Sequence, residues 1–371
     1  MESPHRQPRG PDDKHLHPQE HSSIHNPPRL VAWEVTRSCN LNCVHCRAAS
    51  EKGPYHGELS TDKAKEIIDQ IAKLTKPIII LTGGEPLMRD DIYELAEYGT
   101  SLGMRMVMAT NGTLLTPETG EKLKSAGIQR LSISLDAADA ESHDRFRNVP
   151  GAFDSALKGI EILKNAGLEF QINTTITKHN AKEIETILEM AIRLEAVAHH
   201  IFLLVPTGRA KDMVNQEIDA LEYENLLHWF YDKQDKVPLH LKATCAPHYY
   251  RILRQEARKK GEKVDFDTYG LDAVTRGCLG GTGFCFISYD GIVQPCGYLE
   301  LNCGDLNKAS FEEIWSSSDI FSRLRDFSAY EGKCGRCEFR KFCGGCRARA
   351  YEATGRYMAE EPLCVYKPAH G

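Results

Sequence analysis

The stretch of chain that decides the fold is Trp33-Glu-Val-Thr-Arg-Ser-Cys39-Asn-Leu-Asn-Cys43-Val-His-Cys46. Three cysteines with the spacing C-x3-C-x2-C follow a short apolar run of β character. A closed structural zinc site normally uses four ligands, so three cysteines are too few for one. They suit a [4Fe–4S] cluster that has three cysteine ligands and one open iron, which can bind and reduce a further molecule.

The composition narrows the class of protein. A chain of 371 residues is long enough for one large α/β domain and a smaller second one, and its formal net charge of -6 gives no reason to expect nucleic acid as a partner. No apolar run is long enough to span a bilayer, and the N-terminus lacks the apolar core of a secretory signal. We therefore expect a cytoplasmic protein. Residues 1–28 are rich in His and Pro and cannot build a core, so they are predicted to be a disordered tail.

The thirteen cysteines fall into two zones: three lie in the opening stretch, nine lie between Cys278 and Cys364, and Cys245 stands alone. In a reducing compartment an odd number of cysteines with C-x2-C pairs indicates metal or cluster ligation rather than a disulfide framework. Two chemical sites are therefore expected.

A β/α alternation runs from residue 29 to residue 206. Apolar runs predict strands at 31–36, 78–82, 105–110, 131–135, 170–176 and 200–205, and helical spacing lies between them at about 60–75, 91–102, 117–126, 153–166 and 180–195. Strands that alternate with helices form a parallel sheet with right-handed crossovers. The predicted fold class is α/β, a partial (β/α)6 barrel of the TIM type, with its chemistry at the C-terminal ends of the strands.

The rest of the chain is divided into two further parts. Residues 207–275 are predicted to be a bridging helical region, with helices at 217–235 and 247–263. Residues 276–371 form a Cys-rich extension with a hairpin at 284–296, turned at Asp290-Gly291, and a helix at 310–327.

A Gly-Gly-Glu-Pro loop, Gly83-Gly84-Glu85-Pro86, follows the second predicted strand. Together with the three-cysteine loop after the first strand, it resembles the radical S-adenosylmethionine (SAM) enzymes. This resemblance implies that Cys39, Cys43 and Cys46 hold a catalytic [4Fe–4S] cluster, and that the Gly-Gly-Glu-Pro loop binds the amino group of SAM. It also implies further SAM contacts at strand ends, namely Asn111, Ser134, Asp136 and Asn173, with adenine near residues 205–209. Arg147 is either a ligand of the SAM carboxylate or an exposed helix arginine.

The cysteines of the extension resemble the SPASM domain of radical SAM enzymes. Cys278-x12-Gly291-x4-Cys296 and Cys334-x2-Cys337-x5-Cys343 fit its pattern, whereas the two-residue gap from Cys343 to Cys346 is one residue short. The resemblance implies one or two auxiliary [4Fe–4S] clusters, one held by Cys334, Cys337, Cys343 and Cys364 and the other by Cys278, Cys285, Cys296 and Cys346. A zinc ribbon is the alternative. Cys245 and Cys303 are expected to be buried thiols.

From about residue 29 to 368 the chain resembles the heme b synthases of the siroheme-dependent pathway. Local matches are Phe202-Leu-Leu-Val-Pro-Thr-Gly-Arg209 and Cys343-Gly-Gly-Cys-Arg-Ala-Arg-Ala350. The resemblance implies oxidative decarboxylation of two propionates of iron-coproporphyrin III, with an iron-porphyrin substrate and a flavodoxin or ferredoxin as electron donor. Candidate contacts to the substrate carboxylates or iron are Arg209, Arg347, Arg349, His199 and His200. The alternatives are an enzyme acting on didecarboxysiroheme, a peptide-modifying SPASM enzyme and a zinc-stabilised binding protein.

Overall fold

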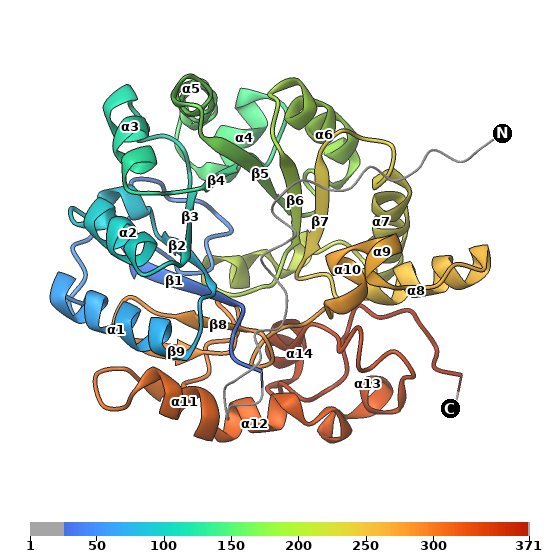
Figure 1. The fold of residues 1–371 in the computed structure, drawn as a ribbon. Helices are drawn as coiled ribbons and strands as arrows, with labels where there is room; N and C mark the ends of the chain where they lie inside the picture. Colours follow the sequence, from blue (N-terminus) through green and yellow to red (C-terminus); the bar gives the residue numbers. More distant parts are fainter. Residues whose placement is uncertain (1–25, 370–371) are drawn as a thin grey trace.

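The computed structural model describes residues 26–369, and its centre is one mostly parallel sheet. The strands lie in the order β10-β9-β8-β1-β2-β3-β4-β5-β6-β7. The pairs from β8 through β1 to β7 are parallel, whereas β9 is antiparallel to both β8 and β10. Figure 1 shows the sheet curving into an open barrel with helices along its outside. The strands are β1 (Leu30–Thr36), β2 (Ile78–Gly83), β3 (Arg105–Thr110), β4 (Arg130–Ser134), β5 (Glu169–Ile176), β6 (Ala198–Leu203), β7 (His240–Thr244), β8 (Phe284–Ile287), β9 (Ile292–Gln294) and β10 (Gly304–Asp305).

Helices follow the strands, as the β/α alternation predicts. The described helices are α1 (Thr61–Leu74), α2 (Ile92–Ser101), α3 (Pro117–Ser125), α4 (Ala140–Arg147), α5 (Ala152–Ala166), α6 (Ile184–Arg193), α7 (Ala220–Lys233), α8 (His248–Lys260), α9 (Phe266–Tyr269), α10 (Leu271–Val274), α11 (Phe311–Ser317), α12 (Asp319–Arg325), α13 (Gly332–Arg336) and α14 (Arg347–Thr354). The 3-10 helices are η2 (Pro86–Met88), η3 (Ala181–Glu183), η4 (Gly208–Gln216) and η5 (Phe327–Ala329). Within residues 26–369, none of the helices could cross a bilayer, since none is both long and apolar enough.

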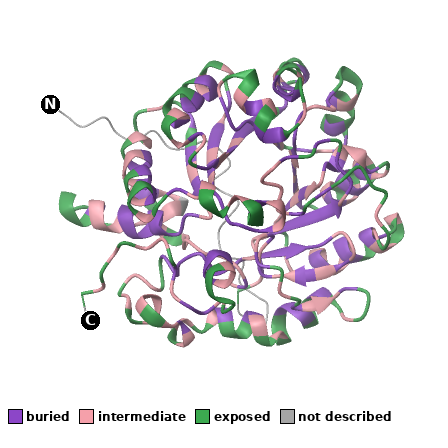
Figure 2. Cartoon of the chain, turned by 180° about the vertical axis from the view of Figure 1, so that it is seen from behind, coloured by how far each residue is buried: buried purple, intermediate pink, exposed green. Residues whose placement is uncertain are grey.

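The main core lies between the outer face of the sheet and the helices. Alternate residues of β1, Val31, Trp33 and Val35, are buried in it, as are Ile67 and Ile71 of α1. Figure 2 shows buried residues along the strands and on the inward sides of the helices. Because side chains of a strand point alternately to opposite faces, the intervening residues of each strand face the inside of the barrel.

Local sequence signals explain where the helices begin. Ser60 caps α1 by accepting a hydrogen bond from the Lys63 amide, and Thr116 caps α3 with Pro117 in its first turn. A cap of this kind contributes about 1 kcal/mol. The predicted helix starts at these two positions are confirmed.

The six predicted strands are all present, but the sheet is larger than the predicted six units. β7 lies inside the expected bridging region and pairs with β6, and β8 from the Cys-rich extension pairs with β1. β7 was missed because it is only five residues long and two of them, Leu241 and Ala243, carry its apolar face. Helix α4 was also missed, and the predicted helix at 310–327 is wrong as a single element, since it is broken at Ser318 into α11 and α12.

The predicted hairpin and tail have different outcomes. β8 and β9 form the hairpin, turned at Gly291 with a φ of +93°. Most of the predicted tail, residues 1–25, lies outside the described residues. At its end the Asn26 carbonyl accepts a hydrogen bond from the Trp315 indole N–H at 3.3 Å.

Candidate active site

The three-cysteine loop leaves the C-terminal end of β1 and folds into a small apolar cluster. Cys39 and Cys43 are buried and Cys46 is half-buried. The Leu41 amide donates to the Cys39 sulfur and the Ser50 amide to the Cys46 sulfur, each at 3.4 Å. Hydrogen bonds to sulfur and a low-dielectric setting are the means by which proteins tune iron–sulfur clusters. Burial raises the pKa of Cys39 to about 12, so the thiol carries its proton at neutral pH when no metal is bound. Because a cysteine ligand binds metal as the thiolate, metal binding would release this proton.

The Gly-Gly-Glu-Pro loop packs directly against the segment that leads to Cys39. The Gly84 amide donates to the Thr36 carbonyl at 2.9 Å and the Glu85 amide to the Ser38 carbonyl at 2.8 Å. A Cβ atom on Gly83 would lie 2.2 Å from the Thr36 oxygen, and one on Gly84 would lie 2.4 Å from the Ser38 oxygen. Only glycine permits this approach, so the loop pair expected from the sequence is brought together.

Glu85 links the ends of β2 and β3. Its buried carboxylate accepts hydrogen bonds from the Thr110 hydroxyl at 2.7 Å and the Asn111 amide at 2.8 Å, and it caps the 3-10 helix that begins at Pro86. Burial raises its pKa to about 7. The Asn111 side chain in turn donates to Asn40, inside the cysteine loop, at 2.9 Å. Asn40 was not among the predicted site residues, because no motif in the neighbouring sequence distinguishes it from other loop asparagines.

Asp136 and Arg147 form a buried ion pair beside Cys43. Arg147 Nη2 lies 2.5 Å from Asp136 Oδ2, and Nη1 donates to the Cys43 sulfur at 3.6 Å. The second oxygen of Asp136 accepts from the Thr175 amide at 2.8 Å. Burial alone would raise the pKa of Asp136, but Arg147 and neighbouring histidines hold it below its usual value. The alternative of an exposed Arg147 is wrong, since the residue is 7% exposed.

Ser134 and Asn173 lie side by side on the inner face of the barrel. Ser134 of β4 is in register with Asn173 of β5, which is in register with His200 of β6. His199 points the opposite way: it is fully buried, it shares a 2.9 Å hydrogen bond with Thr174, and burial lowers its pKa to about 4. His199 is therefore a packed histidine rather than a substrate or iron contact, whereas His200 remains a candidate.

The segment after β6 holds the cysteine loop from the other side. Gly208 has a φ of +55°, and a Cβ atom there would lie 2.4 Å from the Cys46 carbonyl oxygen. Arg209 donates through Nε to the Cys43 carbonyl at 2.8 Å and through Nη1 to the Ser50 carbonyl at 2.9 Å. Arg209 therefore supports the backbone of the cluster loop through Nε and Nη1. Its Nη2 has no hydrogen-bond partner among the described residues, so a contact to a substrate carboxylate stays a prediction.

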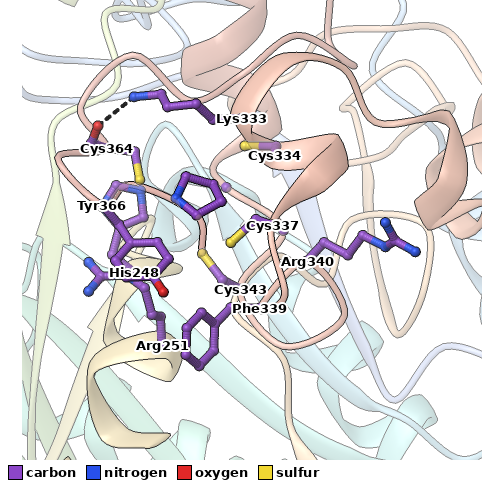
Figure 3. Close-up of a pocket in the computed structure, with 13 residues that line it drawn as sticks. His248, Arg251, Lys333, Cys334, Cys337, Phe339, Arg340, Cys343, Cys364 and Tyr366 are labelled. Carbon is purple, nitrogen blue, oxygen red and sulfur yellow. Dashed lines mark hydrogen bonds between the residues drawn. The ribbon is translucent and has the colours of Figure 1, made fainter. Parts of the chain in front are cut away.

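Four C-terminal cysteines line a single cavity, which Figure 3 shows with their sulfur atoms facing the same space. They are Cys334, Cys337, Cys343 and Cys364. Arg251, Lys333 and Arg340 also line the cavity. Cationic side chains around four thiolates offset the negative charge of a bound cluster, so the residues present fit an iron–sulfur group.

Arg347 does not line this cavity but contacts the sulfur of Cys334, which does. It is 1% exposed, donates to the carbonyls of Tyr357 and Ala359 at 3.1 and 2.6 Å, and donates to the Cys334 sulfur at 3.5 Å. Arg349 is 2% exposed and is paired with Glu361. Neither arginine is available as the substrate anchor that the sequence analysis expected.

The second predicted set of C-terminal cysteines is only partly assembled. Cys296 and Cys346 pack in the same apolar cluster, whereas Cys285 belongs to the main core together with Cys303. Cys285 is therefore the member of this predicted set whose side chain packs in the main core. Within residues 26–369, no three His, Cys, Asp or Glu side chains are arranged to hold a single metal ion, so the fit to clusters rests on the loops and N–H···S contacts above.

Comparison with known proteins agrees with this geometry. Residues 33–191 match the radical SAM superfamily, and residues 278–338 match the SPASM iron–sulfur cluster-binding domain. An AdoMet-dependent heme synthase of Nitratidesulfovibrio vulgaris is 58% identical, over 92% of this chain and 93% of that protein. The chain belongs to the radical SAM heme synthase family. A second member, from Methanosarcina barkeri, is 56% identical over 92% of this chain and 98% of its own length.

Two further comparisons concern proteins that are less similar to this heme synthase family member. An Fe-coproporphyrin III synthase of Methanosarcina barkeri is 32% identical over 90% of this chain and 87% of that protein. The structure of Streptococcus suis SuiB bound to S-adenosylmethionine superposes with a TM-score of 0.73 at 18% identity, covering 91% of this chain and 77% of that one. At this identity the likeness shows the fold alone.

Membership of this family settles the chemical class. The chain is a radical SAM enzyme whose cofactors are SAM and iron–sulfur clusters, and the zinc-stabilised binding protein is set aside. The assignment of individual cysteines and SAM contacts stays a prediction, now supported by the way the loops meet.

Proposed function

We propose that this enzyme converts two propionate side chains of iron-coproporphyrin III to vinyl groups and so forms heme b. The observation that carries the proposal is the 58% and 56% identity to AdoMet-dependent heme synthases over 92% of the chain. A further relative is named an Fe-coproporphyrin III synthase, a name that gives as product the compound proposed here as substrate. The cytoplasm is the proposed compartment, and a flavodoxin or ferredoxin the proposed electron donor.

The reaction balances when each propionate loses one hydrogen atom, carbon dioxide and one electron. Held by the three-cysteine loop and the Gly-Gly-Glu-Pro loop, the first cluster and SAM would supply the radical chemistry that removes a hydrogen atom from the carbon next to the ring. Loss of carbon dioxide and one electron from the substrate would then leave the vinyl group. The C-terminal cysteines would hold a cluster that accepts this electron.

The chain's own residues orient these parts. Arg209, Gly208 and the Gly-Gly-Glu-Pro loop hold the cysteine loop from two sides, and the Asp136–Arg147 pair places a cation against the Cys43 sulfur. A cation at this position suits the carboxylate of SAM. Rigid backing of this kind keeps the reacting groups in a productive geometry.

Arg47 is the proposed anchor for a substrate carboxylate. It follows Cys46 directly, and its guanidinium lies 4.4 Å from the ring centre of Phe286 and 3.9 Å from Glu34 on the inner face of the barrel. Its Nη1 reaches the Gly297 carbonyl only at 3.5 Å, so most of its five N–H groups remain free of strong protein bonds. A bidentate arginine is well suited to a propionate.

The test is an anaerobic incubation of the full-length enzyme with SAM, a reductant and iron-coproporphyrin III. Formation of heme b, carbon dioxide and 5′-deoxyadenosine supports the proposal. Cys43→Ala is the control, because it removes a predicted ligand of the first cluster while the C-terminal cysteines remain. If SAM is cleaved while the porphyrin is recovered unchanged, and didecarboxysiroheme is consumed instead, the substrate assignment is wrong.

A further inference from the structure

Four thiols gather at the junction between the barrel and the Cys-rich extension. Cys245, Cys296 and Cys346 contact the same apolar cluster around Val205 and Leu299. The amide of Cys278 donates to the Cys343 carbonyl at 3.2 Å, three residues before Cys346. This backbone hydrogen bond joins the segment that carries Cys278 to the segment that carries Cys346.

The backbone beside Cys278 also packs on the backbone beside Cys245. A Cβ atom on Gly277, the residue before Cys278, would lie 2.4 Å from the Cβ atom of Pro247, two residues after Cys245. The segments that carry these two cysteines are therefore in direct contact.

Cys285, the cysteine expected here from the sequence, faces the other side of the sheet. It is in register with Val31, whose side chain lies in the main core, and both residues are fully buried. Its neighbouring titratable groups are Cys303 and Arg325. A strand residue on the outer face cannot reach a group bound on the inner face without a one-residue slip in register.

The backbone at Cys245 is held in an unusual conformation. Cys245 follows β7 directly and has a φ of +56°, a left-handed conformation that residues other than glycine rarely adopt. Its carbonyl accepts a hydrogen bond from Arg349 Nη2 at 3.2 Å, and Arg349 pairs with Glu361 at 3.3 Å. Glu361 in turn accepts the Cys346 amide at 2.6 Å. One buried ion pair therefore fixes both cysteines, and strain of this kind is characteristic of functional sites.

We infer that Cys245 is the fourth ligand of the auxiliary iron–sulfur cluster held by Cys278, Cys296 and Cys346, and that Cys285 is not a ligand. With four thiolates this cluster has no open iron, so it suits electron transfer rather than substrate binding. It would lie next to the first site, because Arg47 of the cysteine loop contacts the Gly297 carbonyl beside Cys296. This inference does not depend on which porphyrin the enzyme uses.

The experiment counts clusters in full-length protein whose Cys39, Cys43 and Cys46 are all replaced by alanine, so that the auxiliary clusters are seen alone. Iron, sulfide and Mössbauer spectra are measured after anaerobic reconstitution. The parent should hold about eight iron ions in two clusters. Adding Cys245→Ala should remove between one and four iron ions and leave the second cluster intact. Adding the matched change Cys285→Ala should leave iron and spectra unaltered.

Two results would overturn the inference: loss of iron in Cys285→Ala with none in Cys245→Ala, or equal iron in both variants and the parent. If Cys245→Ala loses all of its iron through misfolding, Cys245→Ser decides. Retained iron with a Mössbauer spectrum altered at one iron supports ligation through residue 245. A spectrum identical to that of the parent contradicts it.

Discussion

Replacing Gly208 by alanine is expected to damage the first cluster site without touching any cysteine. Gly208 has a φ of +55°, and its added Cβ would lie 2.1 Å from the Arg47 carbonyl oxygen. An ordinary contact is about 3.5 Å, so the loop that carries Cys46 must move by about 1 Å. A displacement of about 1 Å at a reacting centre costs roughly a hundredfold in rate. We therefore expect 5′-deoxyadenosine formation to fall by about that factor.

Gly261→Ala is the matched control. Gly261 ends α8 with a φ of +70°, and a Cβ there would meet nothing within 4 Å. Both variants carry the left-handed strain of about 1–2 kcal/mol, but only Gly208→Ala also displaces the cysteine loop. The assay is 5′-deoxyadenosine formation with saturating SAM and reductant, normalised to iron content. If the two variants cleave SAM at rates within about threefold of each other, the packing argument is refuted.

Asp136→Asn should destabilise the protein by about 3–5 kcal/mol, because it leaves Arg147 charged and unpaired in a buried site; the anaerobic thermal midpoint measures this. Since the folded-state pKa of Asp136 is lowered, the stabilisation is present above about pH 4 and is lost as pH falls through that lowered pKa, so the wild-type and variant midpoints should converge in acid. Arg47→Gln should raise KM for iron-coproporphyrin III by roughly tenfold while SAM affinity stays the same, and an unchanged KM would remove Arg47 as an anchor. Glu85→Gln replaces one acceptor oxygen by an amide N–H₂, which would face the hydrogen-bond donors Thr110 or Asn111. This change should weaken SAM binding by roughly tenfold, as measured by equilibrium dialysis. Wild-type affinity would show that the carboxylate is not needed.

Much of the fold and of the first site is predictable because the signals are local. Each of the six predicted barrel strands carries an apolar run, and Ser60 and Thr116 mark helix starts by their own chemistry. The C-x3-C-x2-C and Gly-Gly-Glu-Pro loops each follow a strand, and parallel strands bring such loops to the same end of a sheet. The sequence therefore predicts that they meet, as they do.

The second set of cysteines is not predictable in the same way, because its membership depends on which face of a strand each residue occupies. Cys285 and Cys296 lie close in sequence, yet β8 turns Cys285 toward the main core. Cys245 is remote in sequence and follows a strand too short to be recognised. Likewise, Arg209, Arg347 and Arg349 read as free cations, but their partners are carbonyls and a carboxylate supplied mostly by distant loops.

The most direct test of the proposed reaction is the ratio of 5′-deoxyadenosine to heme b in a single anaerobic incubation with iron-coproporphyrin III. Each propionate requires one radical, so the proposed reaction gives about two molecules of 5′-deoxyadenosine and two of carbon dioxide for each heme b formed. Release of 5′-deoxyadenosine without any vinyl product, under conditions in which all clusters are loaded, would contradict it.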